Sequence, residues 1–135
     1  MSVTLPAGWS RQDAMRELLA GIAQDLLAYA SLKDLLRQQF EAALAHRAAE
    51  LGAAAEAIST LVDAMQLRRQ QRVALVQRLV GPSATMTQAF ALLKSTARER
   101  MEADWTTLEQ SVVECKRLSK EIGRASCRER VCMSV

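Results

Sequence analysis

The sequence predicts an all-α protein, a long antiparallel helical hairpin or coiled-coil-like bundle of three to four helices. Proline occurs only at Pro6 and Pro82, and half of the residues are hydrophobic although few are aromatic. This composition is typical of long helices and not of sheets. Apolar residues also recur at steps of three and four along three stretches, which places them on one face of a helix. At 135 residues the chain can bury one modest core.

The first helix is predicted to begin after Ser10, a candidate N-cap, and to run to Ala43. Its apolar seam consists of Met15, Leu19, Ile22, Leu26, Tyr29, Leu36, Phe40 and Ala43. We expect Leu26 and Leu36 to be buried between helices. Lys33 is the one polar residue that interrupts the seam, and a polar residue at such a position is typical of register-setting contacts with a partner helix.

A break in the helical pattern is predicted between Ala45 and Gly52, where the apolar spacing drifts. Compactness favours a tight turn there, whereas the absence of proline and the many alanines favour a continuous helix, so both alternatives stay open. The pattern resumes at Leu51, Ala54, Ile58, Leu61 and Met65 and continues through Val73, Val76 and Val80. Gly81-Pro82 predicts the end of this second helix.

Two capping boxes are predicted after Gly81-Pro82. Thr85 with Gln88 begins a short helix, and Thr96 with Glu99 begins the last one. The seam of the last helix is Met101, Trp105, Leu108, Val112, Cys115 and Leu118. The short and last helices fit one continuous helix equally well.

The C-terminal segment differs from the rest. Residues 121–131 resemble one translated reading frame of a common sequencing adapter, so residues 121–135 are expected to be non-native. Residues 1–120 then form a single helical domain whose natural chain continued past Lys120. Cys115 is its one cysteine, as suits a reducing compartment. Residues 1–9 lack the basic start and apolar centre of a secretory signal, and we expect a cytoplasmic protein.

The residue inventory favours a protein that is not an enzyme and that carries no metal or cofactor. The single histidine, His46, lies on an alanine-rich stretch and is expected to be solvated. Cys115 lies on an apolar seam, which is typical of a small core residue and not of a nucleophile. The glycines are isolated, so no phosphate-binding loop is predicted, and no apolar run reaches the length of a membrane span.

Arg68, Arg69 and Arg72 form the one local cluster of charge. The cluster is interpreted as a solvated helix face or as a docking patch for an acidic protein. A nucleic-acid interface is disfavoured because no aromatic residue is interleaved and the net charge is only +3.

The order of several motifs resembles the FlgN family of flagellar export chaperones, particularly its lateral-flagella-like members. The motifs are Leu18-Leu19 with Tyr29, Gln39-Phe40-Glu41-Ala42-Ala43-Leu44, Ile58 to Val62, Arg68-Arg69-Gln70-Gln71-Arg72-Val73-Ala74-Leu75-Val76, Trp105-Thr106-Thr107-Leu108 and Glu114-Cys115-Lys116-Arg117-Leu118. The resemblance covers about residues 12–120. The asparagines usual near the end of the last motif are absent, because Ser119-Lys120 lead directly into the adapter-like segment.

The resemblance implies a cytoplasmic type III export chaperone. Members of the family hold the hook–filament junction proteins FlgK and FlgL, their clients, and deliver them to the export gate component FlhA. In the family the C-terminal part of the last long helix holds the client and the extreme C-terminus contacts the gate. In this chain only the start of that helix is present before the adapter-like segment, and the client-binding residues expected there are Trp105, Leu108, Val112, Cys115 and Leu118. We therefore expect weak client binding by a chain that lacks its natural continuation.

Two other functions remain open. A structural coiled-coil or helical-bundle protein fits the same seams and differs by forming a stable homo-oligomer without an export client. A basic helical nucleic-acid-binding protein uses the arginine cluster, and its binding falls steeply with salt.

Overall fold

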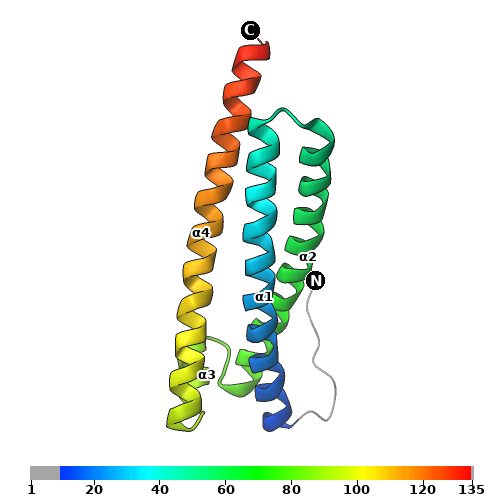
Figure 1. Cartoon of the computed structure of the whole chain (residues 1–135). Helices are drawn as coiled ribbons and strands as arrows, with labels where there is room; N and C mark the ends of the chain where they lie inside the picture. Colours follow the sequence, from blue (N-terminus) through cyan, green and yellow to red (C-terminus); the bar gives the residue numbers. More distant parts are fainter. Residues whose placement is uncertain (1–9, 135) are drawn as a thin grey trace. The chain divides into compact units, whose positions relative to one another are not determined.

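The computed structural model describes residues 10–134, with side chains described for residues 10–123. Within these residues the chain forms four helices, α1 (Arg11–Leu44), α2 (Ala48–Leu79), α3 (Met86–Phe90) and α4 (Ser95–Ser134) (Figure 1). No strand occurs within residues 10–134, so the predicted all-α class is confirmed. The structure has two compact units, and α1, α2 and α4 each contribute to both. The first unit contains the described residues up to Leu27 together with Ala64–Leu108, and the second contains Ala28–Asp63 and the described residues after Leu108.

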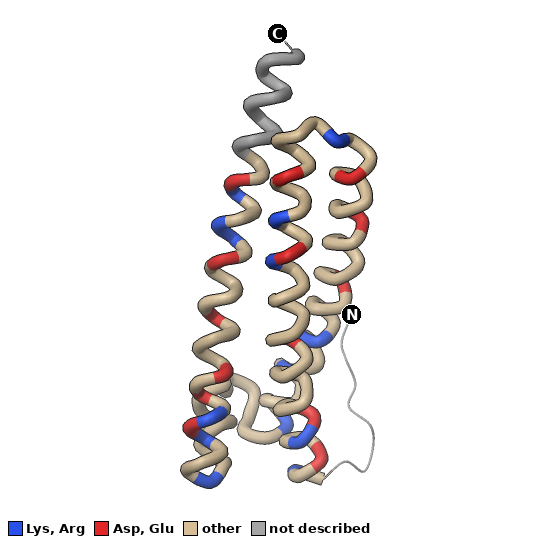
Figure 2. The backbone as a smooth tube through the Cα atoms, viewed as in Figure 1, with Lys and Arg blue, Asp and Glu red and all other residues tan. Residues whose placement is uncertain are grey.

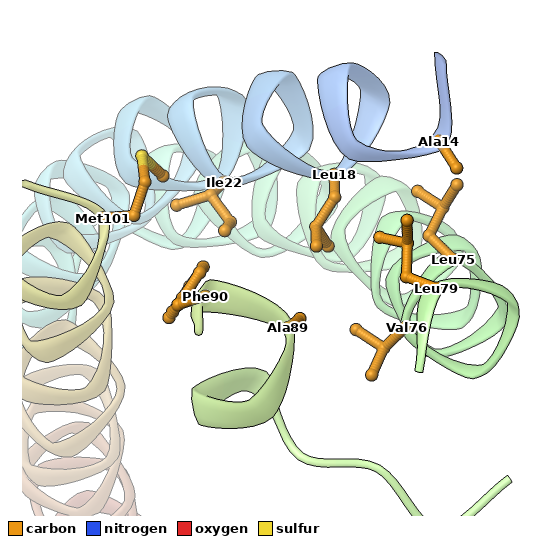
Figure 3. Packing of buried hydrophobic residues seen from close by; sticks show 9 residues of the cluster. All are labelled: Ala14, Leu18, Ile22, Leu75, Val76, Leu79, Ala89, Phe90 and Met101. Atoms are coloured by element: carbon orange, nitrogen blue, oxygen red, sulfur yellow. The ribbon is translucent and has the colours of Figure 1, made fainter. Parts of the chain in front are cut away.

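The core of the first unit brings together residues from all four helices. Its buried members are Ala14, Leu18, Ile22, Leu75, Val76, Leu79, Ala89, Phe90 and Met101 (Figure 3). Phe90 is only 1% exposed and extends from α3 toward Leu18 and Ile22. Because an aromatic ring buries a large area, this one side chain from a five-residue helix contributes much of the stabilisation that holds α3 in place.

The buried line of α1 differs in part from the predicted seam. Ala14 and Leu18 are buried, whereas their predicted neighbours Met15 and Leu19 are only half-buried against the same core. Leu26 is also half-buried, so the prediction of full burial is wrong there. The apolar stripe of a helix is wider than one line of residues, and contacts with the other helices determine which line is covered most.

The core of the second unit is rich in alanine. Its buried apolar residues are Ala28, Leu32, Leu36, Ala42, Ala43, Ala54, Cys115, Leu118 and Ile122. Leu36 is 4% exposed, which confirms its predicted burial, and Cys115 is a buried core residue as its seam position predicted. Lys33 is half-buried, and its positive charge acts on Glu114 and Cys115.

Ser10 caps α1 as predicted. Its Oγ accepts a hydrogen bond from the Asp13 N–H at 3.1 Å, while Asp13 Oδ2 accepts one from the Ser10 N–H at 3.1 Å. The two side chains thus satisfy backbone donors that a helix start leaves unpaired. The pKa of Asp13 is lowered, most by the hydrogen bond from the Ser10 N–H and next by the Ser10 hydroxyl, because both groups stabilise the charged carboxylate.

A tight turn joins α1 to α2, which decides between the two alternatives for residues 45–52. His46 adopts a left-handed conformation with φ of 56°, and this allows the Arg47 N–H to donate to the Ala42 carbonyl at 2.9 Å. The arrangement closes the helix end in the manner of a Schellman motif. His46 itself is exposed.

Of the two predicted capping boxes, the structure contains one and not the other. α2 ends at Leu79, just before Gly81, whose φ is 154°. The Thr85–Gln88 box is present at the start of α3. The Thr96–Glu99 box is wrong, because α4 begins at Ser95 and Thr96 already lies in its first turn. α3 and α4 are separate helices.

α4 continues to Ser134, through the segment expected to be non-native. Among the residues searched, none of the helices combines the length and apolar character that crossing a bilayer requires. Figure 2 shows that α2 carries its acidic residues in its first half and its basic cluster in the second.

Candidate functional site

The five residues of α4 predicted to bind a client all contribute to packing within the chain. Trp105 and Val112 are half-buried, and the other three are between 3% and 7% exposed, namely Leu108, Cys115 and Leu118. Trp105 and Leu108 belong to the first unit and the remaining residues to the second. Beyond Trp105 and Val112, the seam therefore offers little apolar surface to a partner.

Two of the three arginines in the predicted docking patch bind a buried carboxylate. Arg68 donates from Nε to Asp25 Oδ1 at 2.6 Å, and Arg72 donates from a terminal nitrogen to Asp25 Oδ2. The Arg68 and Arg72 side chains are 22% and 15% exposed. The prediction of a solvated face is therefore wrong for these two residues, whereas Arg69 is exposed.

Asp25 is a key residue that the sequence analysis missed. It is 2% exposed and lies three residues after Ile22, on the buried side of α1. A carboxylate in such a position needs a charged or hydrogen-bonding partner to offset its lost hydration. The sequence signal that could have revealed this ion pair was Asp25, an acid three residues after the apolar Ile22, together with Arg68 and Arg72 four residues apart on another helix.

Arg72 also contacts an aromatic ring. Its guanidinium carbon lies 5.3 Å from the centroid of the Trp105 ring, within the range of a cation–π interaction. Trp105 in turn meets Phe90 edge-on, with the ring centroids 6.3 Å apart and an interplanar angle of 67°. Asp25, Arg72, Trp105 and Phe90 therefore form a connected series of contacts in the first unit, with buried residues at both ends and the half-buried Trp105 between them.

A groove lies beside this series of contacts, and we call it the Trp105 groove. It has a volume of 260 Å³ and is lined by Arg69, Arg72, Val73, Val76 and Gln77 of α2, Pro82 and Ala84 of the following loop, Met86 of α3 and Trp105 of α4. Val73 is 48% exposed, which is high for a valine on a packed helix. The lining is thus largely apolar, with polar groups from Arg69, Arg72 and Gln77.

The second unit holds a hollow of 330 Å³ near the turn between α1 and α2. Its walls are mainly alanine and polar side chains, and Arg47 pairs with Glu50 across 3.4 Å within it. Alanine offers little area to anchor a ligand. This hollow is a weaker candidate for a binding site than the Trp105 groove.

No group of three or more His, Cys, Asp and Glu residues that could hold a metal occurs in the part of the chain that was searched. Burial is the largest influence on Cys115 and raises the pKa of its thiol. A raised pKa reduces the fraction of reactive thiolate, so the environment of Cys115 suits packing better than nucleophilic chemistry.

Comparisons with protein-family models, with curated proteins and with solved structures find no match to this chain.

Proposed function

We propose that this protein is an export chaperone of the FlgN type, which holds an amphipathic helix of FlgK-like or FlgL-like junction proteins in the cytoplasm and delivers it to the FlhA gate. The single observation that carries the binding function is the Trp105 groove, an apolar hollow on the first unit beside the exposed Val73. Proteins use such hollows to receive the apolar side chains of a partner helix. The family assignment itself comes from the motif order.

The size of the Trp105 groove matches a small number of anchor residues. At 260 Å³ it lies just below the usual range for small-molecule pockets. One or two apolar side chains of a helix can enter it, and the rest of the client helix then lies along α2. Met86 in its wall can change rotamer to accept different anchors, which suits a chaperone with two clients.

The series of contacts from Asp25 to Trp105 supports the same function. A binding wall gives affinity only if it keeps its shape before the partner arrives. Arg72 is fixed by Asp25 and covers one face of Trp105, while Phe90 contacts that ring edge-on. The wall is therefore preorganised.

This location differs from the client site that the resemblance implied. Of the five predicted α4 residues only Trp105 lines the Trp105 groove, whose lining lies within residues 69–105. Leu108, Cys115 and Leu118 are buried within the chain. Client binding then does not require a natural continuation after Lys120. Delivery to FlhA rests on the resemblance and not on this groove.

Val73→Gln tests the proposed site because it places a polar group in the groove while keeping a good helix former and the net charge. The matched control is Val113→Gln on α4, where the valine is 68% exposed and does not line the groove. Calorimetry with the terminal helical segments of FlgK-like and FlgL-like proteins is expected to show binding weakened about tenfold by Val73→Gln, or about 1.4 kcal/mol. Val113→Gln should bind like the parent.

Two results would contradict the proposal. Equal binding by both variants would remove the Trp105 groove as the client site, and no binding by the parent chain would remove the chaperone function. A stable homo-oligomer in light scattering, with no client binding, would instead support the structural coiled-coil alternative. The nucleic-acid alternative is less favoured because Asp25 occupies Arg68 and Arg72.

A further inference from the structure

We infer that the Trp105 groove selects an acidic amphipathic helix, one that places a carboxylate beside its apolar anchor so that the carboxylate meets Arg69. This inference rests on the proposed function and specifies the chemistry of the client. The anchor side chain enters the hollow beside Val73 and Trp105, and the acidic side chain lies at its edge.

Charge is distributed unevenly along the chain. Residues 64–98 contain six Lys or Arg and no Asp or Glu, although charged residues of both signs occur on either side of this segment. The segment supplies every lining residue of the groove except Trp105. Asp25 pairs with Arg68 and Arg72, and Glu102 pairs with Arg98. The charge of the other cations, Arg69 among them, favours negatively charged partners over positively charged ones.

The three arginines of the cluster differ in whether they have a partner within the chain. Asp25 holds both Arg68 and Arg72, and of these two arginines only Arg72 lines the groove, where it forms a fixed part of the wall. Arg69 also lines the groove but is exposed, and none of the ion pairs or hydrogen bonds found among the described side chains uses it. Arg69 is therefore the cation at this groove that is available to a partner.

The groove residues of α2 lie at helical spacing. Arg69 and Val73 are four residues apart and thus neighbours on one helix face, as are Val73 and Gln77. A client helix lying on this face presents residues at the same spacing, with an acid one turn from its apolar anchor. Gln77 lies one further turn along α2, and its uncharged amide can form a hydrogen bond with the client without repelling an acidic side chain.

The test uses three synthetic amphipathic helices that carry the same leucine anchors. Their flanking positions are glutamate in the first, glutamine in the second and lysine in the third. Binding is followed by calorimetry and by Trp105 fluorescence in a full-length Trp9→Phe chain, in which Trp105 is the only tryptophan. The fluorescence locates the peptide at the groove, while calorimetry gives the affinity.

We expect the glutamate peptide to bind about fivefold more tightly than the glutamine peptide at low salt, the upper end for one exposed ion pair, and the lysine peptide to bind most weakly. The preference should shrink to less than about twofold in high salt, because exposed charges are screened. Arg69→Gln should remove the preference. Arg100→Gln is the control, since Arg100 is an exposed arginine of the first unit that does not line the groove.

The outcomes separate this inference from the proposed function. Equal affinities for the glutamate and glutamine peptides, or an unchanged preference in Arg69→Gln, would overturn acidic selection while FlgK-like and FlgL-like segments still bind. A single-stranded oligonucleotide that displaces the glutamate peptide and binds more tightly would also overturn it. If neither the junction segments nor any peptide alters Trp105 fluorescence, the inference and the groove as client site both fail.

Discussion

Arg72 lies over the ring of Trp105, with its guanidinium carbon 5.3 Å from the ring centroid, and so connects the buried carboxylate of Asp25 to the surface groove. A cation that is held by a buried anion cannot move away from the ring without breaking an ion pair. The position of the tryptophan is therefore coupled to a residue of α1 that does not line the groove. This coupling gives the first prediction.

Asp25→Asn should destabilise the protein by about 3 kcal/mol, because it leaves two partly buried arginines without their anion. Urea unfolding followed by circular dichroism measures the change. The control is Asp34→Asn, since Asp34 pairs with Arg37 at 3.5 Å but its side chain is 71% exposed. Asp34→Asn should lower the free energy of unfolding by less than about 1 kcal/mol. Similar losses in the two variants would show that the buried ion pairs contribute no more than a surface pair.

Three leucines of α1 form a graded series. Leu36 is 4% exposed, Leu26 is half-buried and Leu27 is 73% exposed. Leu36→Ala should cost about 2–5 kcal/mol, Leu26→Ala less, and Leu27→Ala close to nothing, because the loss scales with the buried contacts removed. Thermal melting of the three variants gives the order. A larger loss at Leu26 than at Leu36 would mean that the buried face of α1 is misassigned.

The pKa of Asp13 should lie below the ordinary value for an aspartate, because the Ser10 N–H and hydroxyl both donate to its carboxylate. A depressed pKa in the folded state stabilises the protein above the unfolded pKa, and that contribution disappears as the pH falls through the folded pKa. Nuclear magnetic resonance titration of the carboxyl carbon tests this directly. Ser10→Ala should raise the pKa of Asp13 only part of the way, because it removes the hydroxyl but keeps the Ser10 N–H, which is the larger influence. An unchanged pKa in that variant would contradict the capping box.

A chain that ends at Lys120 should bind FlgK-like and FlgL-like segments as well as the whole chain does, because the lining of the Trp105 groove lies within residues 69–105. Its stability should fall by about 1–2 kcal/mol, since it loses the buried Ile122. Calorimetry and thermal melting measure the two quantities separately. Loss of binding without unfolding would place the client site in the segment after Lys120.

The helices and most of their boundaries could be predicted from the sequence. Helix caps depend on local sequence, because the Ser10 and Thr85 side chains accept hydrogen bonds from backbone N–H groups only three residues away. The three- and four-residue periodicity is likewise a property of one segment. The exception, Thr96, shows the limit of local signals, because a capping pattern one residue inside a helix has the same spacing as one at its start.

The burial of particular faces was decided only by the tertiary structure. Both the Ala14–Leu18 line and the Met15–Leu19 line lie within the apolar stripe of α1, and α2, α3 and α4 together bury the first more deeply. The same holds for Arg68 and Arg72, whose partner Asp25 is 43 and 47 residues away. Charge in a sequence identifies a cation, but whether that cation faces solvent or a buried anion depends on which helices meet.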